Sequence, residues 1–439
     1  MRLAILVLLN AGLLAALGFW LRAEYRRTDL SLRRWLLPAL GWRLLLTAIS
    51  SLWPSPDLIG SHPGQHSPTK WSHWLAAYFW EQPAQIWPTL QSASFHLHGQ
   101  TVTFYKWSNT LFFYKILALL GVASGGVLWL SGLYLSMLCF MACWGLVRGL
   151  AQVFPQAPAA GTGVAFLAWP TVVWWTAGLT KETLVVGAGA GVVALVLPLL
   201  YGRVPAHWWS VASRVALSLL LAWLIVRMRY FFALPLLGGL LALAAVRVAT
   251  RLGWLGSGRS QVAGMALLLA AGGLGAVRAG GEHLSLAYFS REVDANYRHG
   301  LLTSAGRPHL HYANWQPTPA SLLRHAPLAA AQTLLRPWPG ESAQPFYLGA
   351  GLENALLAGL ICVALLAVWR GCPGHLPAAL VALLLGYCLL LAAFIGLSTP
   401  NLGTLSRYRA ALLPWLLLLL LQNDYVRTLL KKIPFFGKQ

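Results

Sequence analysis

The stretch that decides the fold class is residues 183–201, TLVVGAGAGVVALVLPLLY, which runs for 19 residues without a charged side chain. About 20 apolar residues in a helix span the ~30 Å hydrocarbon core of a bilayer, so this stretch predicts a transmembrane helix. Comparable apolar runs recur on both sides of it, at about 3–20, 36–53, 127–147, 162–179, 211–226, 231–246, 262–278, 348–369, 377–397 and 411–421. The sequence therefore predicts an all-α polytopic membrane protein with about 11 transmembrane helices, forming one integral membrane domain over residues 1–439.

The overall composition supports this fold class. Of the 439 residues, 58% are hydrophobic and only 10% are charged, and the mean hydropathy is +0.62. A water-soluble domain carries about 25% charged residues, so the composition excludes an ordinary soluble enzyme. The five cysteines lie mostly inside apolar runs, without the spacing of a metal site or a disulfide framework, and we interpret them as small core residues.

The net charge of +21 indicates an orientation in the membrane and not a nucleic-acid partner, because the 32 Lys and Arg residues are scattered through loops. If the N-terminus is outside, the cytoplasmic segments hold 17 cations against three acids, as the positive-inside rule requires. These segments are 21–43, 148–161, 202–214, 247–261, 370–376 and 422–439. We therefore expect a bacterial cytoplasmic (inner) membrane protein, surrounded by membrane lipids, whose longest loops face the exterior.

Two long loops lie on that exterior side. Residues 54–126 are dense in Trp, Phe, Tyr and His, and their amphipathic aromatic stretches predict interfacial helices that cover a cavity, not a β domain. Residues 279–346 are more polar and predict a small extracytoplasmic cap with short helices.

The acids are informative because so few occur. Eight of the 11 acids fall on the predicted outer side, where long loops readily accept polar residues. Asp57 and Glu182 differ from the rest, since each stands near a predicted helix end in apolar surroundings, where a carboxylate is costly. Four polar segments, far apart in sequence, should emerge together at this face: residues 53–57, 169–182, 227–230 and 398–409.

This convergence suits transfer of a sugar carried on a polyprenyl phosphate, whose lipid stays in the bilayer while its phosphate lies at the interface. Transfer needs a carboxylate that accepts the acceptor's proton, for which we predict Asp57 as the base and Glu182 as a second, positioning acid. It also needs cations for the phosphate leaving group, and arginine forks suit phosphate well. The predicted phosphate- and lipid-donor-binding residues are Lys181, Arg227, Arg229, Arg407, Tyr408 and Arg409. Candidate sugar or acceptor contacts are His62, His66 and Asn401.

These residues also have interpretations that do not involve sugar transfer. The arginines could snorkel to headgroup phosphates, as interfacial arginines commonly do. The His-x-His pairs His96/His98 and His309/His311 could hold a divalent metal ion, but loop histidines in a chain with 12 of them are more often solvated. We therefore expect no firm cofactor and assign no metal ligands.

Residues 169–182, WPTVVWWTAGLTKE, and 400–409, PNLGTLSRYR, look like segments of uncharacterised bacterial polysaccharide-locus membrane proteins. Together with an acid in a long first outer loop, a second acid in the next and a multispan body, the chain resembles the GT-C superfamily of membrane glycosyltransferases. That superfamily includes the protein mannosyltransferases, the aminoarabinose transferases and the oligosaccharyltransferases. The resemblance implies a polyprenyl-phosphate-linked sugar donor, a glycan, lipid or protein acceptor, a catalytic Asp57 and an assisting Glu182. The chain departs from the pattern in its single first-loop acid and in an extra N-terminal helix.

Two other functions remain open from the sequence. An O-antigen-type polysaccharide polymerase also joins lipid-linked glycans outside and uses outer-loop arginines on pyrophosphate. A transporter or flippase of lipid-linked glycans would instead show ionisable residues at mid-membrane depth and paired broken helices.

Overall fold

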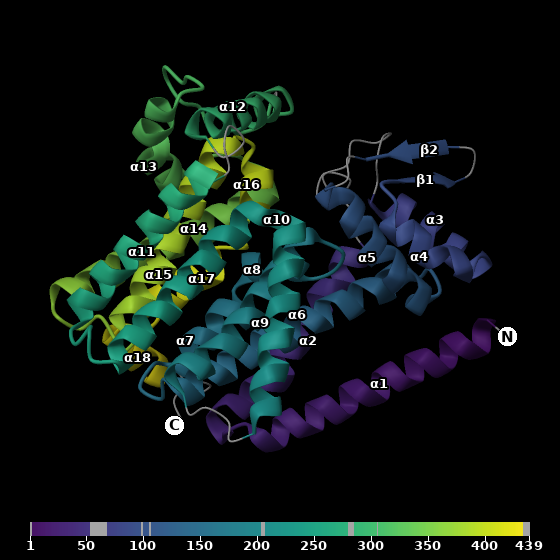
Figure 1. Cartoon of the computed structure of the whole chain (residues 1–439), viewed down its shortest axis with the longest axis horizontal. Helices are drawn as coiled ribbons and strands as arrows, with labels where there is room; N and C mark the ends of the chain where they lie inside the picture. Colours follow the sequence, from purple (N-terminus) through teal and green to yellow (C-terminus); the bar gives the residue numbers. More distant parts are fainter. Residues whose placement is uncertain are drawn as a thin grey trace.

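Helices make up nearly all of the chain, as the apolar runs predict (Figure 1). The computed structural model describes residues 2–52, 68–97, 100–104, 107–202, 207–279, 285–304 and 306–432. In chain order the elements are α1 (Arg2–Arg27), α2 (Leu30–Leu52), α3 (Pro68–Glu81), η1 (Pro83–Gln85), α4 (Ile86–Gln91), β1 (Ser94–Leu97), β2 (Gln100–Thr103), α5 (Asn109–Ser124), α6 (Leu128–Val153), α7 (Ala159–Gly163), η2 (Val164–Ala168), α8 (Pro170–Thr176), α9 (Lys181–Tyr201), α10 (Trp208–Arg251), α11 (Gly258–Ala279), α12 (Leu286–Leu302), α13 (Pro319–Leu335), α14 (Pro345–Trp369), α15 (Ala378–Ser398), α16 (Leu402–Arg409), α17 (Leu413–Leu420) and α18 (Asp424–Lys432).

Within the described residues, seven helices are long and apolar enough to cross a membrane: α1, α6, α9, α10, α11, α14 and α15. The all-α membrane class is therefore confirmed, whereas the count of about 11 spans stays a prediction. The predicted span 162–179 is divided between α7, the π-helical η2 and α8. The division falls at Pro170, which has no N–H with which to continue the preceding helix. The predicted span 411–421 contains only the eight-residue α17.

Helix α10 consists of two helical arms joined by a kink at Arg229, whose φ of −155° and ψ of 82° are not helical, and the chain folds back there. Its two arms pack beside the same part of α9, because Leu221 lies against Gly191 and Leu236 against Gly189. In a straight helix the two leucines would be about 22 Å apart along the axis. The two runs predicted before and after residue 229 are thus the arms of a bent helix.

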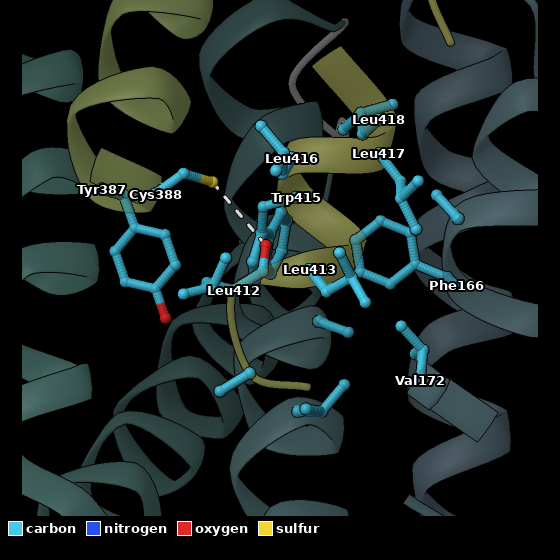
Figure 2. Close-up of a cluster of buried hydrophobic side chains, with 14 of the residues drawn as sticks. Phe166, Val172, Tyr387, Cys388, Leu412, Leu413, Trp415, Leu416, Leu417 and Leu418 are labelled. Carbon is cyan, nitrogen blue, oxygen red and sulfur yellow. Dashed lines mark hydrogen bonds between the residues drawn. The ribbon is translucent and has the colours of Figure 1, made fainter. Parts of the chain in front are cut away.

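Helix α9 lies at the centre of the bundle, between α6 and the arms of α10. Its glycines permit this close approach, since a Cβ added at Gly187 would lie 3.0 Å from the Cα of Cys139. Figure 2 shows a second part of the core, where Trp415 of α17 meets Phe166 of η2 edge to face at 4.9 Å, and the Cys388 thiol donates weakly to the Leu412 carbonyl at 3.7 Å. Small residues and close side-chain contacts are what hold helices together in a membrane, where lipid is as apolar as leucine.

The described part of residues 54–126, the segment predicted to be the first outer loop, has a small hydrophobic core of its own, centred on α3 and α5. Trp71, Leu75 and Phe79 of α3 are buried there, facing Tyr114 of α5. The expected helices are present, but β1 and β2 form an antiparallel hairpin that the sequence analysis did not anticipate. Each strand is only four residues long, too short for a clear alternation of apolar and polar side chains.

The second outer segment carries α12 and α13, as expected for a cap of short helices. Helix α13 packs along α15 so closely that a Cβ added at Gly396 would lie 2.5 Å from the Ala329 carbonyl oxygen. The loop between α12 and α13 also holds the start of α16, since the Leu310 N–H donates to the Pro400 carbonyl at 2.8 Å. The cap therefore positions α16, which carries Arg407.

The opposite end of the bundle, which we call the inner end, has its own ion pair between Glu24 of α1 and Arg148 of α6, at 2.6 Å. Arg247 also lies there and donates to the Leu200 carbonyl at the end of α9. Arg43, however, was counted among the cytoplasmic loop cations, and this assignment is wrong. Helix α2 begins at Leu30, earlier than predicted, so Arg43 lies inside the helix with 1% exposure.

Candidate functional site

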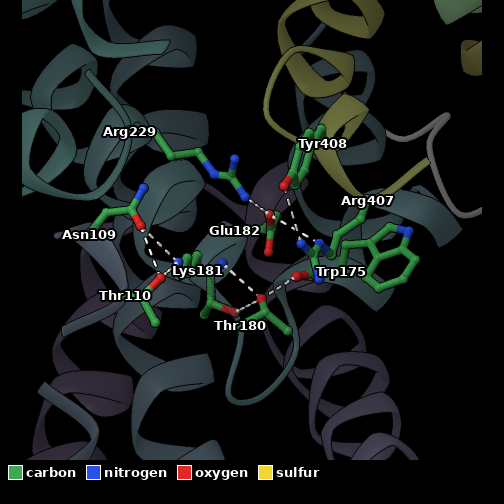
Figure 3. A network of polar contacts seen from close by, with 10 residues as sticks. Asn109, Thr110, Trp175, Thr180, Lys181, Glu182, Arg229, Arg407 and Tyr408 are labelled. Carbon is green, nitrogen blue, oxygen red and sulfur yellow. Dashed lines mark hydrogen bonds and ion pairs between the residues drawn. The ribbon is translucent and has the colours of Figure 1, made fainter. Parts of the chain in front are cut away.

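Five of the predicted site residues meet at one end of the bundle, which we call the outer end after the predicted topology, and we call this cluster the Glu182 site (Figure 3). Lys181 and Glu182 begin α9, Arg229 stands at the bend of α10, and Arg407 and Tyr408 come from α16. Three segments that together span more than two hundred residues of sequence thus supply one polar cluster. They are three of the four segments predicted to converge, and the fourth, residues 53–57, lies outside the described residues.

The turn between α8 and α9 fixes where Lys181 and Glu182 stand. Thr180 caps α9, because its Oγ1 accepts the Thr183 N–H at 3.2 Å and its hydroxyl donates to the Trp175 carbonyl at 2.7 Å. Gly178 has a φ of +97°, which favours glycine. Glu182 therefore falls in the first turn of α9, where the helix dipole favours a carboxylate.

Glu182 is the centre of the site, with only 2% of its side chain exposed. Its Oε1 accepts a hydrogen bond from Arg229 Nη2 at 2.7 Å and lies 3.5 Å from Arg407 Nε, which is an ion-pair distance. A buried carboxylate is costly unless cations and hydrogen bonds compensate it, and two guanidinium groups do so here. Glu182 is thus an ionised residue that holds the two arginines in place, and its geometry suits positioning rather than proton transfer.

Tyr408 lies between the two arginines. Its ring centroid is 4.0 Å from the Arg229 guanidinium carbon and 5.1 Å from that of Arg407, distances typical of cation–π contacts. Burial of the Tyr408 phenol opposes its ionisation, but the adjacent Arg229 and Arg407 cations outweigh burial and lower the pKa of Tyr408. The site therefore has a positive potential that favours anions.

The two arginines also retain hydrogen-bonding capacity. Arg229 Nε is buried without a hydrogen-bond partner among the described residues, and the buried Arg407 Nε has only its 3.5 Å ion-pair contact with Glu182. Their side chains are 14% and 19% exposed, so neither arginine is completely enclosed. Guanidinium groups suit phosphate oxygens because they present several N–H donors in a fixed plane.

Lys181 connects the site to the first outer segment. Its Nζ donates to Asn109 Oδ1 at 3.1 Å and to Thr110 Oγ1 at 2.9 Å, in the first turn of α5. Sequence reasoning did not single out Asn109 or Thr110, because neither stands near an acid or an arginine in the sequence. Lys181 was expected to lie beside Glu182 because the two residues are consecutive in the sequence.

Arg227 lies on the same outer face but not in the cluster. Its guanidinium carbon is 4.6 Å from the Trp107 ring centroid and 5.0 Å from that of Phe112. These cation–π contacts tie the first arm of α10 to the start of α5. The structure thus gives Arg227 aromatic partners, and its predicted role in phosphate binding stays a prediction.

Arg409 does not join Arg407, and the expected arginine fork is not formed. Both residues lie on one helix, α16, where positions two apart diverge by about 200°. Arg409 is fully buried, and its Nη1 donates to Asn354 Oδ1 at 2.7 Å and to the Leu334 carbonyl at 3.2 Å. Burial lowers the pKa of Arg409 to about 10, opposed by Glu353, so the guanidinium remains charged at neutral pH. Its contacts assign Arg409 to the packing of α13, α14 and α16.

The Asn401 side chain, like that of Arg409, forms hydrogen bonds within the protein. Its Oδ1 accepts the Thr404 N–H at 2.9 Å and so caps α16, and its Nδ2 donates to Ser304 Oγ at 3.1 Å. The structure gives Asn401 a capping role, because an Asn before a first helical turn is a strong N-cap, and the expected sugar contact stays a prediction.

Asp57, His62 and His66 lie outside the described residues, so their predicted roles stay predictions. The structure does describe helix α2, which precedes these residues in the sequence. Ser50, near the end of α2, lies 3.5 Å from the Ala177 carbonyl in the turn before Lys181. Helix α2 therefore ends beside the Glu182 site.

The described part of the chain brings no three His, Cys, Asp or Glu side chains together in a way that could hold a metal ion. In the predicted His-x-His pairs, His309 Nδ1 pairs with the Arg307 carbonyl at 2.9 Å and His96 Nδ1 with Thr101 Oγ1 at 2.8 Å. His98 is outside the described residues.

Comparisons of the chain with protein-family models, with curated proteins and with solved structures find no match. The functional interpretation therefore depends on the geometry and chemistry of the Glu182 site.

Proposed function

We propose that the chain is a GT-C-type membrane glycosyltransferase that uses a polyprenyl-phosphate-linked sugar at the outer face of a bacterial inner membrane. The observation that carries the proposal is the arrangement of Arg229, Arg407 and Lys181 around one buried carboxylate, Glu182, at the outer ends of apolar helices. A phosphate carried on a membrane lipid is an anion that reaches this position without leaving the bilayer.

In this proposal each part of the site has a separate task. Arg229 and Arg407 bind the phosphate through the N–H groups that Glu182 leaves free, and Glu182 keeps both guanidinium groups oriented. Asp57 accepts the proton of the acceptor hydroxyl as that oxygen attacks the anomeric carbon, and the polyprenyl phosphate leaves with the bonding electrons. The acceptor is a cell-envelope glycan, lipid or protein.

A transfer assay on the purified full-length protein in liposomes tests this proposal. Radiolabelled polyprenyl-phosphate sugars are supplied with membrane acceptors, and formation of a new glycosidic product is followed. Asp57→Asn should remove transfer by two to four orders of magnitude, on the order of 10²–10⁴, while lipid-phosphate binding persists. Exposed Glu292, changed to Gln, is a matched control that should transfer normally. Near-wild-type transfer by Asp57→Asn would contradict the proposed base.

A flippase of lipid-linked glycans is a second candidate that two observations favour. The segment before the site is broken at η2 and Pro170, and α10 bends at Arg229, so broken helices flank Glu182 as in many transporters. The same liposomes separate the two functions. A flippase would move the lipid-linked sugar between leaflets without forming a new glycosidic bond, and a transferase would form the bond without requiring that movement.

A further inference from the structure

Besides Arg409, a further arginine of the bundle is buried. This residue, Arg43, lies close to the Glu182 site and takes no part in it. It is 1% exposed in the interior of α2. Through Nε it donates to the carbonyl and hydroxyl oxygens of Ser136 on α6, both at 3.0 Å, and through Nη2 to the Thr176 carbonyl. A cation inside a membrane-spanning bundle is costly and marks a functional candidate whose partner must be named.

The oxygen atoms that accept hydrogen bonds from Arg43 are all neutral, and the Cys139 side chain is a further hydrogen-bond partner of its guanidinium. One of them, the Thr176 carbonyl, belongs to the last residue of α8. The final carbonyls of a helix have no partner within the helix and carry a partial negative charge. The end of α8 thus serves as the counter-charge that a carboxylate would otherwise supply.

The residues that follow Thr176 form the turn that presents Lys181 and Glu182. Helix α2 holds this turn at a second point, since Ser50 lies seven residues after Arg43, about two helical turns along the same face, and contacts the Ala177 carbonyl. Inside the turn, Thr183 Oγ1 donates to the Gly178 carbonyl at 3.0 Å. A shift at Thr176 would therefore be passed on to the start of α9.

We propose that Arg43 is a positioning residue for the Glu182 site, which fixes the α8–α9 turn against α2 and α6. What the positioned site binds depends on the function proposed above, but the positioning itself does not. A guanidinium holds Ser136 and Thr176 simultaneously because its donors are arranged in a rigid plane. A lysine at the same position would supply charge but only a single-point contact.

The test compares Arg43→Met and Arg43→Lys with Arg148→Met, which removes a partly buried arginine from the inner end of the bundle. All are made in the full-length protein, and farnesyl phosphate is the titrated probe. Arg43→Met should weaken farnesyl phosphate binding on the order of tenfold to a hundredfold, as a misplaced group does. Arg43→Lys should recover part of the loss. Arg148→Met should lower thermal stability and leave the affinity unchanged.

Wild-type affinity in Arg43→Met, or an equal loss in Arg148→Met, would overturn the proposal. Hydrogen exchange of residues 176–184 gives a second readout that needs no ligand. Exchange in this segment should be faster in Arg43→Met than in the wild-type protein and unchanged in Arg148→Met. If Arg43→Met does not fold, Arg43→Lys takes its place in the comparison. If the wild-type protein does not bind farnesyl phosphate, the proposed function fails while the exchange result still decides the role of Arg43. Unchanged exchange in the Arg43 variants would refute it.

Discussion

At the scale of single residues, the Glu182 site shows that one carboxylate can order several cations. Glu182 accepts from Arg229 at 2.7 Å and attracts Arg407 at 3.5 Å, while Tyr408 lies between the two guanidinium groups. Each arginine is thus directed by Glu182 and by the tyrosine ring.

Arg407 and Arg409 make a matched pair for testing this division, because they lie two residues apart on α16 and have opposite surroundings. Arg407→Met should lose lipid-phosphate affinity with a smaller loss of thermal stability than Arg409→Met, because Glu182 keeps its shorter contact with Arg229. Arg409→Met should destabilise the protein by about 2–3 kcal/mol, since buried carbonyls and Asn354 lose a charged donor. Titration of farnesyl phosphate and thermal melting of both variants check this. The reverse assignment of the two effects would be incompatible with the structure.

Glu182→Gln should destabilise the protein, because it leaves two largely buried guanidinium groups without their carboxylate. Breaking a buried ion pair from one side costs about 3–5 kcal/mol. Exposed Glu292, changed to Gln, should have almost no effect. Melting curves of the two variants, recorded in the same detergent, provide the comparison. Equal melting temperatures would show that Glu182 does not hold the arginines.

At the scale of elements, the turn between α8 and α9 carries the strictest backbone requirement of the site. Gly178 has a φ of +97°, and a Cβ there would lie 3.2 Å from Ser50 Oγ. Gly178→Ala should cost on the order of 1–3 kcal/mol and displace Glu182. Gly238→Ala in α10, where a Cβ meets nothing within 4 Å, should be neutral or stabilising by about 0.5–1 kcal/mol. Opposite signs in thermal melting are expected. A Gly178→Ala protein as stable as the Gly238→Ala protein would contradict the strained turn.

The sequence predicts where the long helices lie better than it predicts where each helix begins or how its side chains are oriented. The apolar runs locate the long helices because hydrophobic length is a physical requirement of the bilayer. The reversal at Arg229 was also predicted, since two arginines between apolar runs could not stay in the membrane core. The orientation of Arg407 and Arg409 could not be predicted, because an extended and a helical segment both fit residues 400–409. Arg43 was misplaced because the start of α2 has no strong apolar signal.

At the scale of the whole molecule, polar clusters gather at the two ends of the helices. The Glu182 site and the cap lie at one end, and the Glu24–Arg148 pair lies at the other. Contacts that span more than a hundred residues, such as Glu182 with Arg407, depend on the full packing of the bundle, which no local sequence pattern specifies. The surplus of loop cations predicts only which end faces the cytoplasm.

The orientation is testable with single cysteines in a cysteine-free chain. His311→Cys in the cap and Arg370→Cys after α14 are both at exposed positions on opposite ends. In intact spheroplasts a membrane-impermeant thiol reagent should label the first and not the second, and permeabilisation should expose the second. Labelling of Arg370→Cys alone in intact spheroplasts would reverse the topology and place the Glu182 site in the cytoplasm.

The central claim, that the Glu182 site holds the phosphate of a lipid-linked donor, is tested most directly by a cryo-EM structure of the full-length protein with farnesyl phosphate bound. We predict density for the phosphate within hydrogen-bond distance of Arg229 and Arg407, about 2.7–3.2 Å, with the farnesyl chain directed into the bilayer. A phosphate bound elsewhere, with the guanidinium groups of Arg229 and Arg407 still facing only Glu182 and Tyr408, would contradict the claim.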